Sequence, residues 1–124
     1  MEKRQDHEKE TLLFRVVPTM QCNFRCDYCF LDKKRETGTM FDEHNVAEWV
    51  KAMENYKDYN IELYFWGGEP FCIDETYDLI KGWTQYEHVI GGIRIDTNCY
   101  FADKIAKRCP TNKVKLNCSF HMQY

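Results

Sequence analysis

Short apolar segments alternate with amphipathic segments along most of this chain. Four segments rich in apolar or β-branched residues have the length and composition of strands: residues 12–18, 61–66, 93–96 and 113–120. Glycine, proline and polar residues separate these segments from the regions that follow. The pattern therefore predicts four short strands, each followed by a loop.

Helical spacing of apolar residues predicts three helices between these strands. The first is expected to begin at Asp42 as N-cap and to end near residues 58–60, with one apolar stripe formed by Val46, Trp49, Val50 and Met53. The second is expected to begin at Asp74 and to bury Tyr77, Ile80 and Trp83, and the third covers about residues 101–108 and ends before Pro110. Alternation of strands and helices in this order favours an α/β fold with a parallel sheet of about four strands.

Residues that can bind a ligand or take part in catalysis follow each predicted strand. Cysteines follow the first, Gly67–Pro70 the second, Asn98 the third, and Ser119 to His121 close the fourth. Because the carboxyl ends of parallel strands meet at one edge of a sheet, we expect these four loops to converge there.

The composition is that of one folded domain. The chain has 124 residues, of which 44% are hydrophobic and 15% aromatic, and a formal net charge of −3. Its 17 basic residues are scattered, so no basic face for nucleic acid is expected, and no apolar run is long enough for a membrane span. Residues 1–11 read as a disordered polar tail and residues 12–124 as the domain.

The seven cysteines are not expected to form a disulfide framework. The polar N-terminus has no secretory signal, so we expect a cytoplasmic protein with reduced thiols. Cys72, Cys99, Cys109 and Cys118 are expected to be free packing residues, with a ligand role left open for Cys99 and Cys118. His7, His44 and His88 are expected to face solvent, whereas a ligand or substrate role is left open for His121.

Cys22, Cys26 and Cys29 form a C-x3-C-x2-C cluster that offers three thiols for a metal. A structural zinc site takes four protein ligands, so a zinc site here would need Cys99, Cys118 or His121 as the fourth. A non-enzymatic zinc or iron–sulfur module, acting through protein contacts, is therefore one reading of the cluster.

The cysteine cluster, with Tyr28 just before its last member, and the sequence GGEP after the second strand together resemble the radical S-adenosylmethionine (radical SAM) enzymes. The resemblance covers about residues 12–121 and implies a partial, TIM-like barrel. It also implies a [4Fe–4S] cluster held by the three cysteines, with the fourth iron left open for S-adenosylmethionine. Reductive cleavage of that cofactor would give a 5′-deoxyadenosyl radical that abstracts hydrogen from a substrate.

The resemblance also assigns expected roles to single residues. Gly67, Gly68, Glu69 and Pro70 would bind the amino group of the methionyl moiety, with the glycines allowing close approach of the backbone. Tyr28 would lie beside the adenine, and Asn98 and Ser119 are candidates for ribose or carboxylate contacts.

Expected partners follow from the same resemblance. The charge run Lys33–Arg35 is a candidate docking site for a one-electron donor such as flavodoxin or ferredoxin. The pattern C-N-x-x-C-x-Y-C resembles members that modify peptides or proteins. The family's barrel usually has further strand–helix units, so we expect a fragment of a longer protein; the alternatives are pairing with another chain, self-association through the open sheet edge, or a compact member.

Overall fold

A parallel four-stranded sheet forms the centre of the protein. The computed structural model describes residues 9–21, 38–109 and 112–118. Its strands are β1 (Thr11–Val16), β2 (Asn60–Phe65), β3 (Ile93–Thr97) and β4 (Val114–Cys118), which are adjacent in the order β1-β2-β3-β4. All three neighbouring pairs are parallel. The sheet does not close on itself within the described residues, so the predicted α/β fold of a partial barrel is confirmed.

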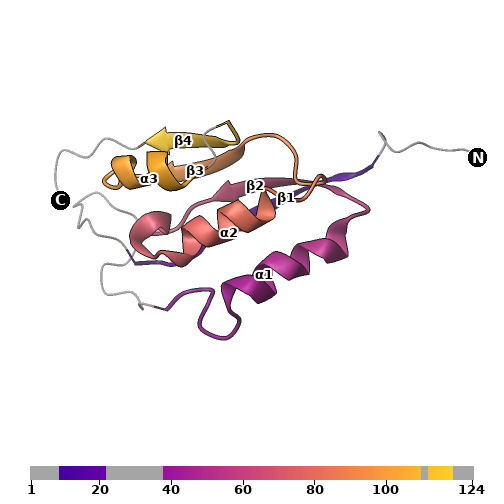
Figure 1. The fold of residues 1–124 in the computed structure, drawn as a ribbon, viewed down its shortest axis with the longest axis horizontal. Helices are drawn as coiled ribbons and strands as arrows, with labels where there is room; N and C mark the ends of the chain where they lie inside the picture. Colours follow the sequence, from indigo (N-terminus) through magenta and orange to yellow (C-terminus); the bar gives the residue numbers. More distant parts are fainter. Residues whose placement is uncertain (1–8, 22–37, 110–111, 119–124) are drawn as a thin grey trace, which may run out of the picture.

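The connections between the strands are helical. They contain α1 (Val46–Ala52) with the 3-10 helix η2 (Met53–Tyr56), the 3-10 helix η3 (Pro70–Cys72) with α2 (Glu75–Trp83), and α3 (Ala102–Arg108). Figure 1 shows α1, α2 and α3 on one side of the sheet. No helix of the described residues is long and apolar enough to cross a bilayer.

The start of the first helix differs from the prediction. Asn45, not Asp42, is the N-cap of α1, and it forms a capping box with Glu48, in which each side chain accepts from the other residue's backbone amide. The Asp42 carboxylate instead accepts from the Thr39 amide at 3.0 Å in the preceding turn. Both residues are good caps, and the reciprocal bond to Glu48 decides between them.

The core lies between the sheet and its helices. Alternate residues of β2 and β3 are buried there, namely Ile61, Leu63 and Phe65, and Ile93 and Ile95. Tyr77, Ile80 and Trp83 of α2 are buried as predicted, whereas on the first predicted stripe only Met53 is buried and Val46, Trp49 and Val50 are partly buried against the core. Each fully buried side chain of this kind contributes about 1.5–3 kcal/mol of transfer free energy.

His88 also departs from the prediction, because it is buried and not solvent-facing. Its side chain is 7% exposed, and Nε2 lies 2.9 Å from the Met53 carbonyl oxygen. The imidazole thus bonds the backbone of η2, while His44 is exposed as predicted. An isolated histidine between a polar turn and a strand gives no sequence signal that separates these two cases.

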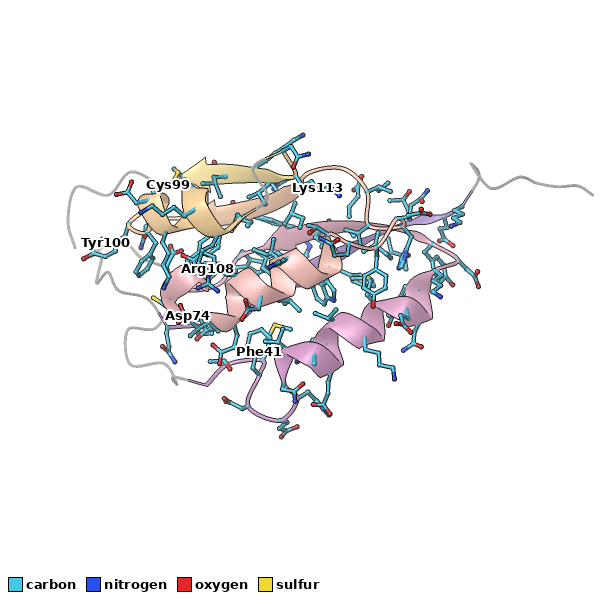
Figure 2. All side chains as sticks on the ribbon, viewed as in Figure 1. Phe41, Asp74, Cys99, Tyr100, Arg108 and Lys113 are labelled. Carbon is cyan, nitrogen blue, oxygen red and sulfur yellow. A yellow bond between two sulfur atoms is a disulfide. The ribbon has the colours of Figure 1, made fainter. Side chains whose placement is uncertain are left out.

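Charged side chains connect the start of α2 to α3 across the surface. Lys104 Nζ lies 2.7 Å from Asp74 Oδ1, and Arg108 lies 3.5 Å from Asp74 and 3.3 Å from Asp78. Figure 2 shows Asp74 at the start of α2 and Arg108 on α3. The hydrogen bond from Lys104 is the main cause that lowers the pKa of Asp74. Because these pairs are exposed, they orient α3 but add little stability.

The buried Tyr77 hydroxyl has no hydrogen-bond partner among the described residues, and the side chain is 1% exposed. Burial raises the pKa of Tyr77 from 10.0 to about 12. Folding therefore favours the neutral phenol, and stability should fall as the pH rises from 10.0 through about 12. We expect Tyr77→Phe to stabilise the protein by about 1 kcal/mol at pH 7, because an unpaired buried polar group is removed.

Urea unfolding at pH 7 and at pH 11 measures both effects. The Tyr77→Phe variant should lose less stability between these two pH values than the parent protein does. Tyr100→Phe is the matched control, since Tyr100 is exposed. Marked destabilisation by Tyr77→Phe at pH 7 would contradict the assignment of an unpaired hydroxyl.

The opposite face of the sheet is mostly polar and is not covered by a described helix. Arg15, Tyr64, Arg94 and Lys115 occupy one register row across the four strands. The guanidinium carbons of Arg94 and Arg15 lie 4.2 and 5.8 Å from the centre of the Tyr64 ring. The Tyr64 hydroxyl donates to Asp96, so this face carries an ordered polar row.

Candidate functional site

The GGEP turn follows β2 directly. The Trp66 amide donates to the Val16 carbonyl at 3.0 Å, which extends the pairing with β1 by one bond. Gly67 then takes a φ of +124°, which a residue with a side chain rarely adopts, and the chain turns away from the sheet. Glu69 caps η3 by accepting from the Phe71 amide, and Pro70 is the first residue of that helix.

This turn is hydrogen-bonded to the segment that precedes the cysteine cluster. The Gly68 amide donates to the Thr19 carbonyl at 3.2 Å, and the Glu69 amide donates to the Gln21 carbonyl at 2.7 Å. Gln21 is the residue before Cys22 in the sequence. The structure therefore joins the GGEP turn to the backbone that leads into the first of the three clustered cysteines.

The segments on either side of residues 22–37 are also joined to each other. Thr19 and Thr39 form an antiparallel bridge, and the Met40 amide donates to the Pro18 carbonyl at 2.9 Å. Thr19 is buried, and its Oγ1 donates to the Gly38 carbonyl and accepts from the Gln21 amide. The residues on the two sides of the cysteine-containing segment are thus hydrogen-bonded to each other.

The glycines of the turn allow this close approach. A Cβ on Gly67 would lie 2.8 Å from the Thr19 carbonyl oxygen, and a Cβ on Gly68 would lie 2.1 Å from the Gln21 and 2.4 Å from the Met20 carbonyl oxygen. The sequence predicted that these glycines admit a ligand. Within the described residues, the atoms nearest to both positions belong to the segment 17–21.

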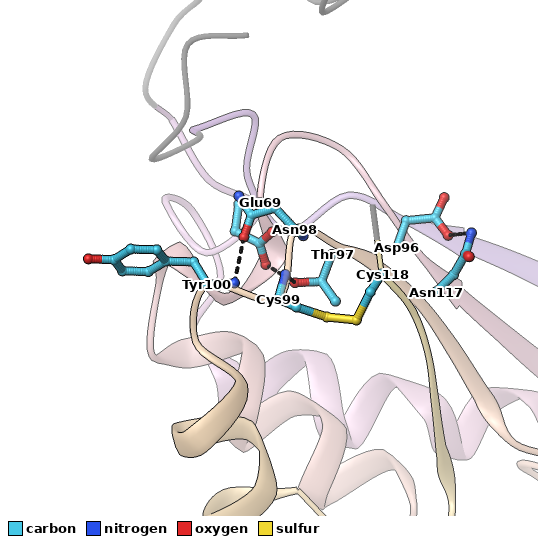
Figure 3. Close-up of a disulfide and its surroundings, with 8 residues drawn as sticks. All are labelled: Glu69, Asp96, Thr97, Asn98, Cys99, Tyr100, Asn117 and Cys118. Atoms are coloured by element: carbon cyan, nitrogen blue, oxygen red, sulfur yellow. Dashed lines mark hydrogen bonds between the residues drawn. A yellow bond between two sulfur atoms is a disulfide. The ribbon is translucent and has the colours of Figure 1, made fainter. Parts of the chain in front are cut away.

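Glu69 is the centre of a buried hydrogen-bond network at the carboxyl ends of β2 and β3 (Figure 3). Its side chain is 1% exposed. Oε2 accepts from Thr97 Oγ1 at 2.7 Å and from the Phe71 amide at 3.2 Å, and Oε1 accepts from the Asn98 amide at 2.7 Å. These bonds compensate for the burial of a carboxylate and fix its orientation.

Asn98 and Thr97 contribute to this network in different ways. Asn98 donates its backbone amide to Glu69, while its Oδ1 accepts from the Tyr100 amide at 2.9 Å and closes a turn. Asn98 is a predicted site residue, whereas Thr97 is not. A threonine at the end of an otherwise apolar buried strand is the signal that could have found it.

Cys99 and Cys118 form a disulfide, which corrects the prediction that both are free packing residues (Figure 3). Cys118 is the register partner of Thr97 on the neighbouring strand, and Cys99 turns back toward it with a φ of +62°. Their Cα atoms are 5.6 Å apart, within the usual range for a disulfide. Cys109 is a free buried thiol, as predicted.

Several predicted site residues lie outside the described residues: Cys22, Cys26, Cys29, Tyr28, Ser119, His121 and the run Lys33–Arg35. Their assigned roles stay predictions. Within residues 9–21, 38–109 and 112–118, no three His, Cys, Asp or Glu side chains are grouped so that they could hold a metal ion. Two candidate fourth ligands for zinc, Cys99 and Cys118, are bonded to each other.

Comparison with known proteins agrees with this arrangement. The sequence profile of the radical SAM superfamily matches residues 16–120, which is most of the chain. Comparison with curated protein sequences found no match. The matched range begins at the end of β1 and includes β2, β3, β4 and the GGEP turn. The chain therefore belongs to the radical SAM superfamily.

Proposed function

We propose that this chain carries the cofactor site of a radical SAM enzyme. The observation that supports the proposal most directly is the buried Glu69 carboxylate, held in a turn that is hydrogen-bonded to the backbone before Cys22. When bound, a [4Fe–4S] cluster and S-adenosylmethionine supply a 5′-deoxyadenosyl radical that abstracts hydrogen from a substrate. The residues described at this edge of the sheet fit an ammonium-bearing ligand, because Glu69 is an oriented carboxylate with little exposure to water.

Under this proposal each part of the chain has a separate task. Cys22, Cys26 and Cys29 hold the cluster through their thiolates. The turn of Gly67–Pro70 binds the methionyl end of the cofactor, and Thr97 and Asn98 keep the Glu69 carboxylate in place. Burial of this network excludes water from the groups that orient the cofactor.

The substrate that we propose is a peptide or protein that lies over the polar face of the sheet, which no described helix covers. The row of Arg15, Tyr64 and Arg94 supports this placement, because guanidinium and phenol groups bind peptide carbonyls and carboxylates. The electron donor that we propose is an acidic protein such as a flavodoxin or ferredoxin, which docks on Lys33–Arg35.

Anaerobic reconstitution with iron and sulfide tests the proposal. We expect a brown protein with about four irons per chain, which forms 5′-deoxyadenosine when dithionite and S-adenosylmethionine are added. Alanine at Cys22, Cys26 or Cys29 should abolish cluster binding, because each thiolate holds one iron. Cys109→Ala is the control, since Cys109 is a free buried thiol next to α3.

Two results would contradict the proposal. One is a colourless protein that holds a single zinc, which would favour the metal-binding module. The other is an unchanged iron content after substitution of any of the three clustered cysteines. Loss of iron in Cys109→Ala as well, with the fold intact, would show that iron binding is not specific to Cys22, Cys26 and Cys29.

A further inference from the structure

The Cys99–Cys118 disulfide lies at the same edge of the sheet as the Glu69 network. Cys118 ends β4, and Cys99 is in the turn that follows β3. Figure 3 shows the disulfide beside Thr97 and Asn98, the two residues that donate to Glu69 from β3 and its turn. The bond therefore connects the end of β4 to the turn that orients the buried carboxylate.

Cys99 is part of the same hydrogen-bond chain. Its amide donates to Thr97 Oγ1 at 3.1 Å, and Thr97 Oγ1 donates to Glu69 Oε2 at 2.7 Å. Among the described residues, Cys99 is the only one other than glycine with a positive φ, at +62°. A side chain is unfavourable in this conformation, and such outliers are maintained by surrounding structure and often mark functional sites. The disulfide is the covalent constraint that holds Cys99 there.

We propose that Cys99 and Cys118 are a redox-active pair that exchanges with a cellular dithiol, and that the oxidised pair keeps Thr97 and Asn98 in position on Glu69. The first part of this inference stands on the disulfide alone. The second part, an effect on S-adenosylmethionine affinity, rests on the proposed function. Reduction releases the turn from β4, and the cofactor site becomes less ordered.

The exchange is an ordinary thiol–disulfide reaction. A thiolate of the dithiol attacks Sγ of Cys118, the S–S bond of the pair breaks, and the Cys99 thiolate leaves and takes up a proton. The second thiolate of the dithiol then attacks the mixed disulfide and releases the Cys118 thiolate, which is also protonated. The pair gains two electrons and two protons, and the dithiol is oxidised to its disulfide. A low-molecular-weight disulfide reverses the reaction.

Because of its exposure, Cys118 is more accessible to an external thiolate than the other described cysteines are. Cys118 is exposed and Cys99 half-buried, so an external thiolate can reach the bond. Cys109 is buried, and burial raises the pKa of its thiol, which makes it inert. Cys109 is therefore the internal reference for thiol reactivity.

The first experiment measures the pair in the reconstituted protein. Samples are equilibrated anaerobically in buffers of different ratios of reduced to oxidised glutathione, then acid-quenched, alkylated and mapped as peptides. We expect the linked Cys99–Cys118 peptide to disappear and reappear reversibly across the series, while Cys109 stays reduced. Thiols at residues 99 and 118 that remain free even in oxidised glutathione would overturn the proposal.

The second experiment measures the coupling to the site. Reduction should increase hydrogen exchange at the Asn98 and Cys99 amides and weaken S-adenosylmethionine binding about tenfold, the change expected when one charged hydrogen bond is lost. The Cys118→Ser variant cannot form the disulfide, so it should behave like the reduced protein in every buffer. Cys99→Gly, which fits the positive φ, should also lose redox sensitivity, and Cys109→Ala should respond as the parent protein does.

The outcomes separate the two proposals. A pair that titrates without any change in amide exchange or cofactor affinity would overturn the coupling. If the pair titrates and the amides respond, but no S-adenosylmethionine binds in either state, the redox pair is supported and the proposed function fails.

Discussion

Replacing Gly68 by alanine is expected to destabilise the protein by about 3 kcal/mol or more and to abolish cluster assembly. The new Cβ would lie 2.1 Å from the Gln21 carbonyl oxygen and 2.4 Å from that of Met20. Both atoms belong to the backbone, so no rotation of a side chain can relieve the contact. The turn and the segment before Cys22 must separate, which breaks the hydrogen bonds from Gly68 to Thr19 and from Glu69 to Gln21.

Gly91→Ala is the matched control for this substitution. Gly91 has a φ of +69°, but no atom lies within 4 Å of its Cβ position. Alanine there should cost only the backbone strain, about 1 kcal/mol. Urea unfolding and iron content after reconstitution measure both variants. Equal effects of the two would show that crowding against residues 20–21 does not hold the turn in place.

The sequence predicted the order and type of the elements because strand and helix periodicities differ clearly in this chain. The branched residues of β2 and β3 alternate with polar ones, and Tyr77, Ile80 and Trp83 repeat with helical spacing. Boundaries were less certain, since Asp42 and Asn45 are equally good N-caps in isolation. Only the partner three residues later, Glu48, decides the choice.

The convergence of the described parts of these loops was predictable from strand direction alone, but the contacts within the site were not. Compartment and cysteine count do not predict the disulfide, because it depends on the register of β3 and β4, which places Cys118 opposite Thr97. The expectation for the glycines of GGEP was incomplete for a similar reason. The close contact at Gly67 and Gly68 is with residues 17–21, and the pairing of those segments depends on the folded sheet.

Glu69→Gln is expected to weaken S-adenosylmethionine binding by tenfold or more and to reduce stability by about 1–3 kcal/mol. The carboxylate accepts from donors on both oxygens: the Asn98 amide on Oε1, and Thr97 Oγ1 and the Phe71 amide on Oε2. Glutamine has nearly the same volume but only one carbonyl oxygen. In either orientation, its NH₂ group faces a backbone N–H, so at least one buried donor loses its acceptor.

The control for this variant is Glu62→Gln on the exposed face of β2, which should change stability by less than about 0.5 kcal/mol. Equilibrium dialysis with S-adenosylmethionine and urea unfolding give the two readouts. Loss of stability with unchanged cofactor affinity would mean that Glu69 supports the fold without orienting the ligand. We expect instead that S-adenosylmethionine affinity falls in addition to stability. The reason is that the substitution removes the charge of the carboxylate at the position where the methionyl ammonium group binds.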